Sequence, residues 1–285
     1  MRLLSDLNSI LQKPIMTEKN SSVYHVISEL TKNNISRLII TDKNYPVGIV
    51  TEKDIGLFLL NNDTEKNLDD VSISSIMNNL TSVHDSMSVE DCAEMMLEKK
   101  IGSLGVVSNN NGLVGIITKT DLASYYVDNC EGRHSVGDVM TISYISMNSE
   151  DYLKDVVSKM IGEKISRLFL KNNDNELEGI ITFRDLFNVS LEQGNSDTVL
   201  DNSDPAISIL FTRKGFLSDS GFGKTIQAKD VMSKDIVTVD FKDDLVVACK
   251  AMIKNKINGV GVNINGKLGG VVSKTDILKA IYIDK

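Results

Sequence analysis

Cysteine, histidine and long apolar runs are all scarce in this sequence of 285 residues. Its three cysteines, Cys92, Cys130 and Cys249, are odd in number and far apart, which argues against a disulfide framework. The three histidines lack metal-ligand spacing, and no run approaches the roughly 18 apolar residues of a membrane span. We therefore expect a reduced, cytoplasmic protein without a metal site or membrane segment. Cys92 and Cys249 lie in apolar helical stretches and are expected in the core.

Positive charge is also in short supply, because 31 lysine and arginine residues face 39 acidic ones and the formal net charge is -8. This balance gives no general footprint for nucleic acid or for an anionic membrane surface. The N-terminus has no apolar stretch of signal-peptide length. A hydrophobic content of 41% is nevertheless enough for real cores, so wholesale disorder is not expected.

A complete phosphate-binding P-loop is absent, although the peptide SGFGKT at 220–225 resembles the end of one. The motif G-x-x-x-x-G-K-[ST] requires a glycine five residues before Gly223, where this sequence has Ser218. The preceding segment is too polar and broken for a buried strand. We interpret this peptide as part of a glycine- and serine-containing linker.

One peptide pattern, in contrast, occurs four times: glycine, two β-branched residues, threonine or serine, two variable residues and aspartate. It reads GIVTEKD at 48–54, GIITKTD at 115–121, GIITFRD at 179–185 and GVVSKTD at 270–276. Each copy follows a short hydrophobic piece, an amphipathic stretch such as SVYHVISELTKN, and an apolar segment such as NISRLIIT. The same order of segments, repeated four times, indicates an internal repeat.

Each repeat is expected to form strand, helix, strand, strand and helix, because apolar residues at three- and four-residue steps predict a helix and short apolar runs predict strands. A unit of roughly 60 residues buries too little surface alone, so the repeats should pack in pairs within an α/β (α+β) fold. The expected domains are repeat 1 (1–64), repeat 2 (65–131), repeat 3 (132–192), an insert or linker (193–226) and repeat 4 (227–285).

The motif G-h-h-[TS]-x-x-D and its surroundings resemble the cystathionine β-synthase (CBS) domain, and the resemblance covers nearly everything outside about 191–226. Two paired CBS domains form a Bateman module, so the resemblance implies two such modules. The architecture is similar to stand-alone archaeal four-CBS proteins and to the γ subunit of AMP-activated protein kinase. Those families are associated with adenosine-containing ligands bound in clefts between paired repeats.

The threonine or serine and the aspartate of each motif allow two interpretations. They form an N-terminal capping pattern for the following helix. They also suit a nucleotide, because a helix N-terminus and a hydroxyl favour a phosphate, and a carboxylate accepts hydrogen bonds from ribose hydroxyls. The second interpretation, which the resemblance also implies, assigns phosphate contacts to Thr51, Thr118, Thr182 and Ser273, and ribose contacts to Asp54, Asp121, Asp185 and Asp276.

The resemblance further implies an apolar slot for the base, built from the first short strand and the start of the second. The slot residues would be Met16, Thr17, Ile35 and Ser36 in repeat 1; Thr81, Ser82, Ile101 and Gly102 in repeat 2; Ile145, Ser146, Ile165 and Ser166 in repeat 3; and Val237, Thr238, Ile257 and Asn258 in repeat 4. Simple core packing is an equal alternative for the isoleucines.

In similar kinase γ subunits a basic residue next to the slot isoleucine and serine reaches the phosphates, which implies Arg37 and Arg167. Lys53 and Arg184, at variable motif positions, add cations, so the four sites are predicted to differ.

The interval between motif glycines is 91 residues before repeat 4, against 67 and 64 earlier in the chain. The additional residues include an apolar and basic stretch at 207–216. We expect an extra strand or arm packed on the second module, or a lid that places Arg213 and Lys214 over a polyphosphate.

These observations predict a non-catalytic adenine-nucleotide sensor of the energy-sensing kind, which binds AMP, ADP, ATP or a diadenosine polyphosphate and has no catalytic cofactor. A homodimer and a regulated protein partner are expected. A sensor of S-adenosylmethionine or an NAD-type ligand, and a regulator associated with nucleic acid, are the alternatives. An enzyme is not expected, because the repeats occupy the chain and no nucleophile–base pair stands out.

Overall fold

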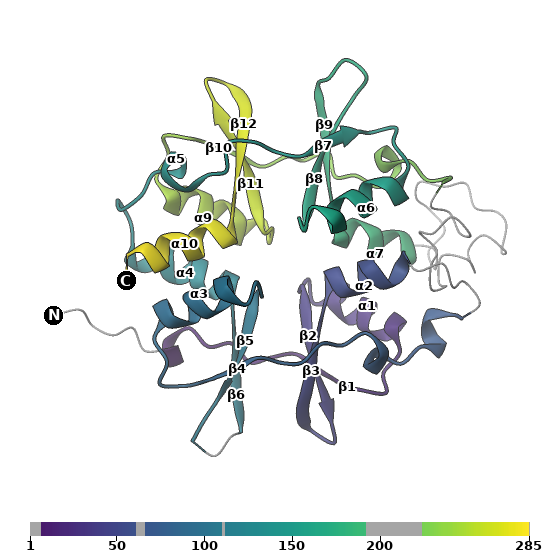
Figure 1. The fold of residues 1–285 in the computed structure, drawn as a ribbon, viewed down its shortest axis with the longest axis vertical. Helices are drawn as coiled ribbons and strands as arrows, with labels where there is room; N and C mark the ends of the chain where they lie inside the picture. Colours follow the sequence, from purple (N-terminus) through teal and green to yellow (C-terminus); the bar gives the residue numbers. More distant parts are fainter. Residues whose placement is uncertain (1–6, 61–65, 110–111, 192–223, 285) are drawn as a thin grey trace. The chain divides into compact units, whose positions relative to one another are not determined.

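The structure is a computed structural model that describes residues 7–60, 66–109, 112–191 and 224–284. It contains the predicted order of strand, helix, strand, strand and helix in each repeat (Figure 1). Repeat 1 consists of β1 (Met16–Glu18), α1 (Val23–Lys32), β2 (Arg37–Asp42), β3 (Tyr45–Thr51) and α2 (Glu52–Leu59). Repeat 2 consists of β4 (Ser82–His84), α3 (Val89–Glu98), β5 (Ser103–Val107), β6 (Leu113–Thr118) and α4 (Lys119–Asn129). Repeat 3 consists of β7 (Ser146–Asn148), α6 (Leu153–Gly162), β8 (Arg167–Lys171), β9 (Leu177–Thr182) and α7 (Phe183–Leu191). Repeat 4 consists of β10 (Thr238–Asp240), α9 (Leu245–Lys254), β11 (Gly259–Ile264), β12 (Lys267–Ser273) and α10 (Lys274–Ile283).

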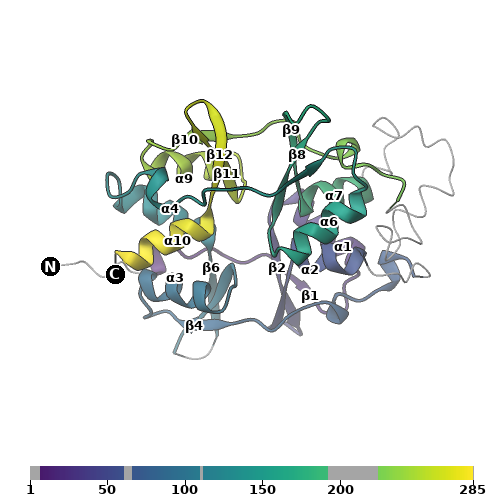
Figure 2. The ribbon, with the colours of Figure 1, turned by 45° about the horizontal axis from the view of Figure 1, so that its top comes forward.

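Each repeat forms its own three-stranded sheet with the second strand in the centre. The first strand pairs parallel to the second, as in the register Thr17↔Ile40, and the helix between them supplies the crossover that parallel strands need. The second and third strands form an antiparallel hairpin (Figure 2). Short helical segments lie ahead of the first strands of the repeats: η1 (Leu7–Ser9), η2 (Leu68–Asp70), η3 (Ile73–Ser75), α5 (Val136–Val139) and η5 (Ala228–Asp230).

The first helix of each repeat buries four apolar residues at positions i, i+3, i+4 and i+7. These residues are Val23, Val26, Ile27 and Leu30 in α1; Val89, Cys92, Ala93 and Met96 in α3; Leu153, Val156, Val157 and Met160 in α6; and Leu245, Ala248, Cys249 and Met252 in α9. This spacing places them on one helix face. The expected core positions of Cys92 and Cys249 are confirmed, and burial raises the pKa of both thiols to about 12.

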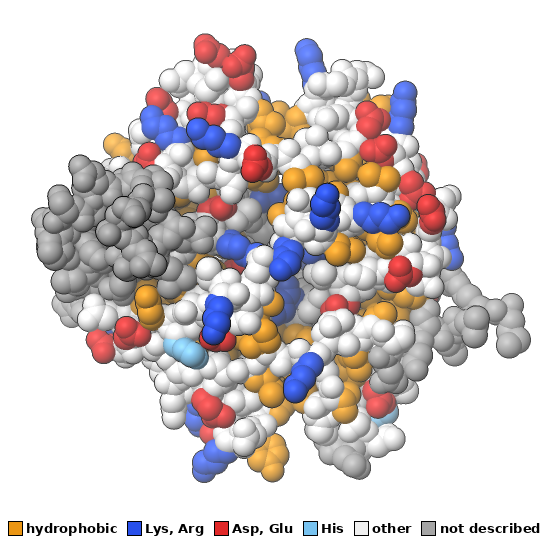
Figure 3. All heavy atoms as spheres, turned by 180° about the vertical axis from the view of Figure 1, so that it is seen from behind, with side chains coloured by type: hydrophobic (Ala, Val, Ile, Leu, Met, Phe, Trp, Pro, Cys, Tyr) orange, Lys and Arg blue, Asp and Glu red, His pale blue; other side chains and the backbone are white. Residues whose placement is uncertain are grey.

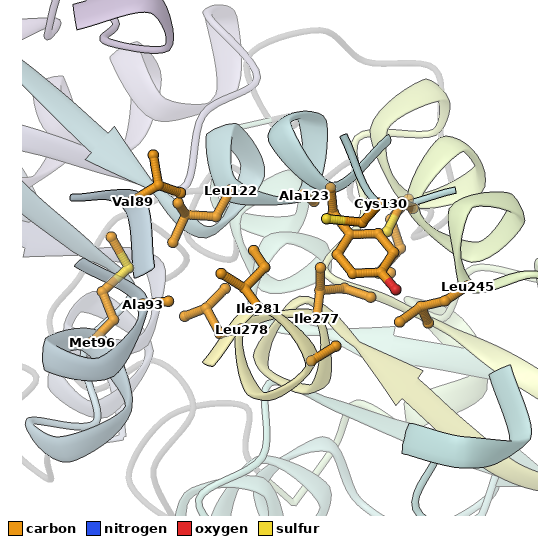
Figure 4. Close-up of a cluster of buried hydrophobic side chains, with 14 of the residues drawn as sticks. Val89, Ala93, Met96, Leu122, Ala123, Cys130, Leu245, Ile277, Leu278 and Ile281 are labelled. Atoms are coloured by element: carbon orange, nitrogen blue, oxygen red, sulfur yellow. The ribbon is translucent and has the colours of Figure 1, made fainter. Parts of the chain in front are cut away.

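The described chain divides into two compact units. Unit 1 contains residues 1–14, 80–144 and 236–285, and therefore repeats 2 and 4. Unit 2 contains residues 15–79 and 145–235, and therefore repeats 1 and 3. In unit 1, α10 packs against α3 and α4, and α4 packs against α9; the core side chains of these helices are shown in Figure 4. In unit 2, α7 packs against α1 and α2.

Short segments ahead of each repeat are exchanged between neighbouring repeats. Gln12, which precedes repeat 1, exchanges two backbone hydrogen bonds of 3.0 and 2.9 Å with Ile116 of repeat 2. Asn78, which precedes repeat 2, bonds in return to Ile49 of repeat 1, with two distances of 2.8 Å. Repeats 3 and 4 are joined in the same way, by Thr141↔Val271 and Ser233↔Ile180. Each exchanged contact lies within one of the two units and links segments of repeats that are neighbours along the chain.

The motif glycines leave room for these exchanged segments. A Cβ atom at Gly270 would lie 2.4 Å from the carbonyl oxygen of Thr141, and one at Gly48 would lie 2.8 Å from that of Asn78. Gly179 and Gly115 face the exchanged segments at somewhat longer distances from the backbone. Packing of the helices, in contrast, joins repeat 1 to repeat 3 and repeat 2 to repeat 4, which the sequence did not predict.

Candidate functional site

The threonine or serine and the aspartate of each motif lie where the third strand ends and the second helix begins. In every repeat the backbone N–H and the hydroxyl of the first residue both donate to Oδ2 of the aspartate. The N–H and hydroxyl distances are 2.9 and 2.5 Å for Thr51–Asp54, 2.8 and 2.7 Å for Thr118–Asp121, 2.7 and 2.7 Å for Thr182–Asp185, and 2.9 and 2.7 Å for Ser273–Asp276. The capping interpretation is therefore confirmed as geometry, and each hydroxyl hydrogen is directed to its own aspartate rather than away from the protein.

The second carboxylate oxygen distinguishes three of the four aspartates. Oδ1 of Asp185 accepts a hydrogen bond from Ser233 at 3.1 Å, and Oδ1 of Asp276 pairs with Lys279 at 2.8 Å. Within the described part of the chain, Asp54 bonds only to Thr51. Burial raises the pKa of Asp185, although hydrogen bonds from Thr182 and Ser233 act in the opposite direction. Of these three aspartates, Asp54 is the one whose Oδ1 has no hydrogen-bond partner among the described residues.

Two predicted phosphate contacts lie in register with the motif threonines. Arg37, the first residue of β2, pairs with Thr51 on β3, and Arg167 pairs with Thr182 in the same way. Ser103 and Gly259 take the equivalent positions beside Thr118 and Ser273. Each arginine therefore lies beside the motif threonine that is predicted to contact the same phosphate. Lys53 is exposed in the first turn of α2.

Arg184, the fourth predicted cation, reaches from repeat 3 to repeat 1. Its Nε and Nη2 atoms lie 2.8 and 2.7 Å from Oε1 of Glu52. Its Nη2 atom also donates to the hydroxyl of Ser36 at 3.2 Å, and its Nη1 atom donates to Oδ1 of Asn34. Burial raises the pKa of Glu52, and the guanidiniums of Arg184 and Arg37 oppose this effect. Sequence reasoning missed Glu52 and Asn34, because a pairing between repeats that are far apart in the chain has no local signal.

Unit 1 has a different junction at the same motif positions. Nζ of Lys119 donates to the hydroxyl of Thr275 at 2.8 Å, and Nζ of Lys274 donates to the hydroxyl of Thr120 at 2.8 Å. The two contacts are reciprocal between repeats 2 and 4. Lys274 is almost fully buried. These residues also escaped sequence reasoning, which assigned no role to the variable motif positions of repeats 2 and 4.

The isoleucines of the predicted base slots terminate the first helix of each repeat. The N–H of Ile35 donates to the carbonyl of Leu30 at 2.9 Å, and Ile101, Ile165 and Ile257 bond to the equivalent helix carbonyls at 3.0 Å. The preceding residue has positive φ in all four cases, as in a Schellman motif, and each isoleucine packs on a core cluster. These isoleucines therefore have a structural role at the ends of the helices. Their contact with a ligand base stays a prediction.

The second members of the slots lie next to the motif. The carbonyls of Ser36, Gly102 and Asn258 accept hydrogen bonds of 3.0–3.1 Å from the first residue of the following second helix. The first members lie further along the second strand: the carbonyls of Thr81, Ile145 and Val237 accept from that strand at 2.9–3.1 Å. Met16 is 49% exposed, and the hydroxyl of Thr17 forms a hydrogen bond with that of Ser21. In repeats 1, 2 and 4 the second members therefore adjoin the Thr/Ser–Asp pairs.

The predicted lid residues Arg213 and Lys214 lie outside the described residues, as does most of SGFGKT. At the end of the expected insert, Ile226 is buried in the core of unit 2, and its carbonyl accepts from Leu153 at 2.8 Å. In the described ranges, no group of three or more His, Cys, Asp or Glu side chains could hold a metal ion. Among those same residues, every helix is too short or too polar to span a bilayer.

Comparison with known proteins assigns the family. The CBS domain family matches residues 5–60, 73–128, 136–192 and 228–283, and the chain belongs to this family. It is 23% identical over 283 residues to the uncharacterised protein MJ1225 of Methanocaldococcus jannaschii, covering 94% of this chain and 95% of that protein. The crystal structure of MJ1225, described as that of a candidate archaeal homologue of γ-AMPK, covers 96% of this chain and 98% of its own, with 22% identity and a TM-score of 0.78. This likeness shows that the two chains share a fold.

Two shorter CBS structures contain bound ligands. PAE2072 of Pyrobaculum aerophilum was solved with AMP; it is 27% identical and covers 41% of this chain and 89% of its own, with a TM-score of 0.37. The CBS domain pair of MJ0100 was solved with 5′-methylthioadenosine and S-adenosyl-L-methionine; it is 29% identical and covers 44% of this chain and 97% of its own, with a TM-score of 0.39. These ligands are properties of those two proteins.

Proposed function

We propose that this protein is a non-catalytic sensor of adenosine-containing ligands, with AMP, ADP, ATP or a diadenosine polyphosphate as the preferred class. The observation that carries the proposal is the fourfold pairing of a hydroxyl and a carboxylate at the N-terminus of a helix. Backbone N–H groups and the partial positive charge of such a terminus favour a phosphate, and the aspartate can accept from a ribose. Membership of the CBS family supports the same reading.

Repeat 1 is the strongest of the four candidate sites. Asp54 bonds only to Thr51 within the described residues, and Arg37 lies in register with Thr51. Arg167 gives repeat 3 the same cation, but Oδ1 of Asp185 is already bonded to Ser233. We infer that ligand enters repeat 1 first, with Thr51 and Arg37 toward the phosphate and Asp54 toward the ribose.

A sensor also requires an output. Ligand must bind two states of the protein differently in order to shift their populations, and we propose that the shifted state contacts a regulated protein partner in the cytoplasm, with the sensor acting as a homodimer. An S-adenosylmethionine or NAD-type ligand is the second candidate, because its adenosine part would present the same ribose hydroxyls to Asp54. On the face drawn in Figure 3, basic and acidic side chains are interspersed, which does not favour a nucleic-acid partner.

Mass spectrometry of small molecules that co-purify with the protein would identify the ligand directly. Thermal melting then tests the class: an adenosine nucleotide at a hundredfold excess over its dissociation constant should stabilise the protein by about 2.7 kcal/mol. Guanosine and cytidine nucleotides should have a much smaller effect. If no adenosine compound at millimolar concentration shifts the melting temperature, the proposal is wrong.

A matched pair of variants separates a ligand contact from a helix cap. Ser135 and Asp138 form a capping box with the same geometry, at 2.7 and 2.8 Å, outside the repeated motif. Asp54→Asn and Asp138→Asn should therefore cost similar stability, about a few tenths of a kcal/mol. Only Asp54→Asn should weaken nucleotide binding, by about 1–2 kcal/mol, because a charged acceptor bonds more strongly than a neutral one. Equal binding by both variants would leave the motif as a cap alone.

A further inference from the structure

Arg184 connects two repeats at the place where the proposed phosphate would bind. It belongs to the first turn of α7 in repeat 3, yet its three nitrogen atoms donate to Glu52, Asn34 and Ser36 of repeat 1. Glu52 directly follows Thr51, and its backbone N–H donates to the carbonyl of Ser36 at 3.1 Å. The guanidinium is thus held against both residues that adjoin the Thr51 cap.

The Glu52 carboxylate carries a negative charge next to the proposed phosphate position. Its side chain is only 13% exposed and that of Arg184 is 26% exposed, so little water screens the pair. A phosphate bonded near Thr51 would approach the Glu52 carboxylate, and two anions close together in such surroundings repel strongly. The guanidinium can neutralise either anion, because its planar set of donors matches a phosphate as well as a carboxylate.

We propose that Arg184 changes partner when the site in repeat 1 is occupied: the ligand phosphate takes the guanidinium from Glu52, and repeat 3 thereby senses the ligand bound to repeat 1. This inference rests on the proposed function and adds its regulation. Arg184 is a ligand-contacting residue in the occupied state and a partner of Glu52 in the empty one. The exchange changes the ion pair that joins α2 to α7, and it therefore gives binding a structural consequence.

The packing around Arg184 fixes its approach. The neighbouring Phe183 lies against Gly56 of α2, where a Cβ atom would be 2.5 Å from Cδ1 of the ring. This close fit holds the start of α7 beside α2. In unit 1 the two variable motif positions are lysine and threonine in both repeats, and Lys119 and Lys274 donate to threonine hydroxyls. Repeats 2 and 4 therefore have a lysine where repeat 1 has Glu52.

Calorimetric titration of the full chain with AMP and with adenosine tests the exchange, because the two ligands differ only in the phosphate. Asp54→Asn first identifies which binding step belongs to repeat 1. At that step Arg184→Gln should weaken AMP binding about tenfold, the loss expected for a charge-assisted contact, and leave adenosine binding unchanged. Glu52→Gln should strengthen AMP binding about three- to tenfold, because the competing carboxylate is gone, again without an effect on adenosine.

Glu163→Gln serves as the control, since it removes the same charge from an exposed pair with Lys159 on α6 and should change neither affinity. If Arg184→Gln does not fold, as judged by circular dichroism, Arg184→Lys keeps the charge without the planar donors and should weaken AMP alone by a smaller factor. AMP and adenosine affinities that change together, or an AMP affinity that neither variant alters, would overturn the exchange and leave the proposed function standing. Failure of both ligands to bind the unaltered protein would remove the proposed function and this inference with it.

Discussion

Unit 1 and unit 2 are built from the same repeat, but the second helices of their repeats meet through different chemistry. In unit 1 the contact is symmetrical, since Lys119 donates to Thr275 and Lys274 donates to Thr120, both at 2.8 Å. In unit 2 the contact is asymmetric, because it combines two different interactions. Glu52 forms an ion pair with Arg184, and Phe183 packs on Gly56.

This difference shows how a repeated fold can acquire unequal sites. The four motifs keep the same cap, so the variable positions inside the motif are free to diverge without loss of the helix start. In repeats 2 and 4 they are both lysine and threonine, whereas in repeats 1 and 3 they are glutamate with lysine, and phenylalanine with arginine. Unit 2 consequently contains an anion that a phosphate would have to displace.

The largest effect is expected from breaking the ion pair of unit 2 on one side. Arg184→Met leaves Glu52 buried without its principal cation and should cost about 2–3 kcal/mol, below the range for a fully buried pair because Arg184 is 26% exposed. The matched change in unit 1, Lys274→Met, removes the hydrogen bond to the Thr120 hydroxyl, and the loss of that bond should cost about 1 kcal/mol.

Urea denaturation of both variants measures the two losses, and hydrogen exchange in α2 and α7, against α4 and α10, shows where they occur. The double variant Glu52→Gln with Arg184→Met should recover part of the stability lost in Arg184→Met, because no buried charge remains. Equal losses for Arg184→Met and Lys274→Met would mean that the two junctions are energetically alike.

A smaller effect is expected from the steric fit in unit 2. Gly56→Ala places a Cβ atom 2.5 Å from the Phe183 ring, and the overpacking should exceed the gain in helix propensity to give a net loss of about 1 kcal/mol. Phe183→Leu in the same chain should restore stability, since the shorter side chain makes room. In unit 1 the same helix position is Ala123, which is buried, and there Ala123→Gly should be the destabilising change. A more stable Gly56→Ala protein would contradict the close packing of α7 on α2.

The repeat and its internal order could be predicted from the sequence because both depend on local patterns. The periodic apolar residues of α1, α3, α6 and α9 all lie on buried helix faces, and the capping role of the motif depends on residues only three positions apart. The exchange of segments also had a local signal that was overlooked. Met77–Asn78, Met140–Thr141 and Met232–Ser233 recur ahead of repeats 2, 3 and 4, opposite the motif glycines.

The contacts between repeats could not be predicted in the same way. Arg184 and Glu52 are 132 residues apart, and no single repeat contains a reason for them to pair. Arg184 was interpreted as a phosphate contact because of its charge, whereas the structure shows that the charge already has an internal partner. The site assignments that depend on a single repeat remain predictions. The contacts between repeats, such as that of Arg184 with Glu52, could be found only from the three-dimensional structure.

The smallest effect concerns pH and isolates Glu52 from the rest of unit 2. Burial raises the pKa of this carboxyl above its ordinary value, so the folded protein retains a proton there at pH values where the unfolded chain has lost it. A group of this kind contributes stability at low pH that is lost as the pH rises from about 4.5 through the folded pKa. Glu52→Gln imitates the protonated form, so its stability relative to the unaltered protein should increase over that interval and then stay constant. Urea midpoints of both proteins between pH 4 and 8 measure this difference. A Glu52→Gln protein that instead loses relative stability as the pH rises would show that Arg184 outweighs the burial of Glu52, and that the empty state of unit 2 holds its ion pair too firmly to release it.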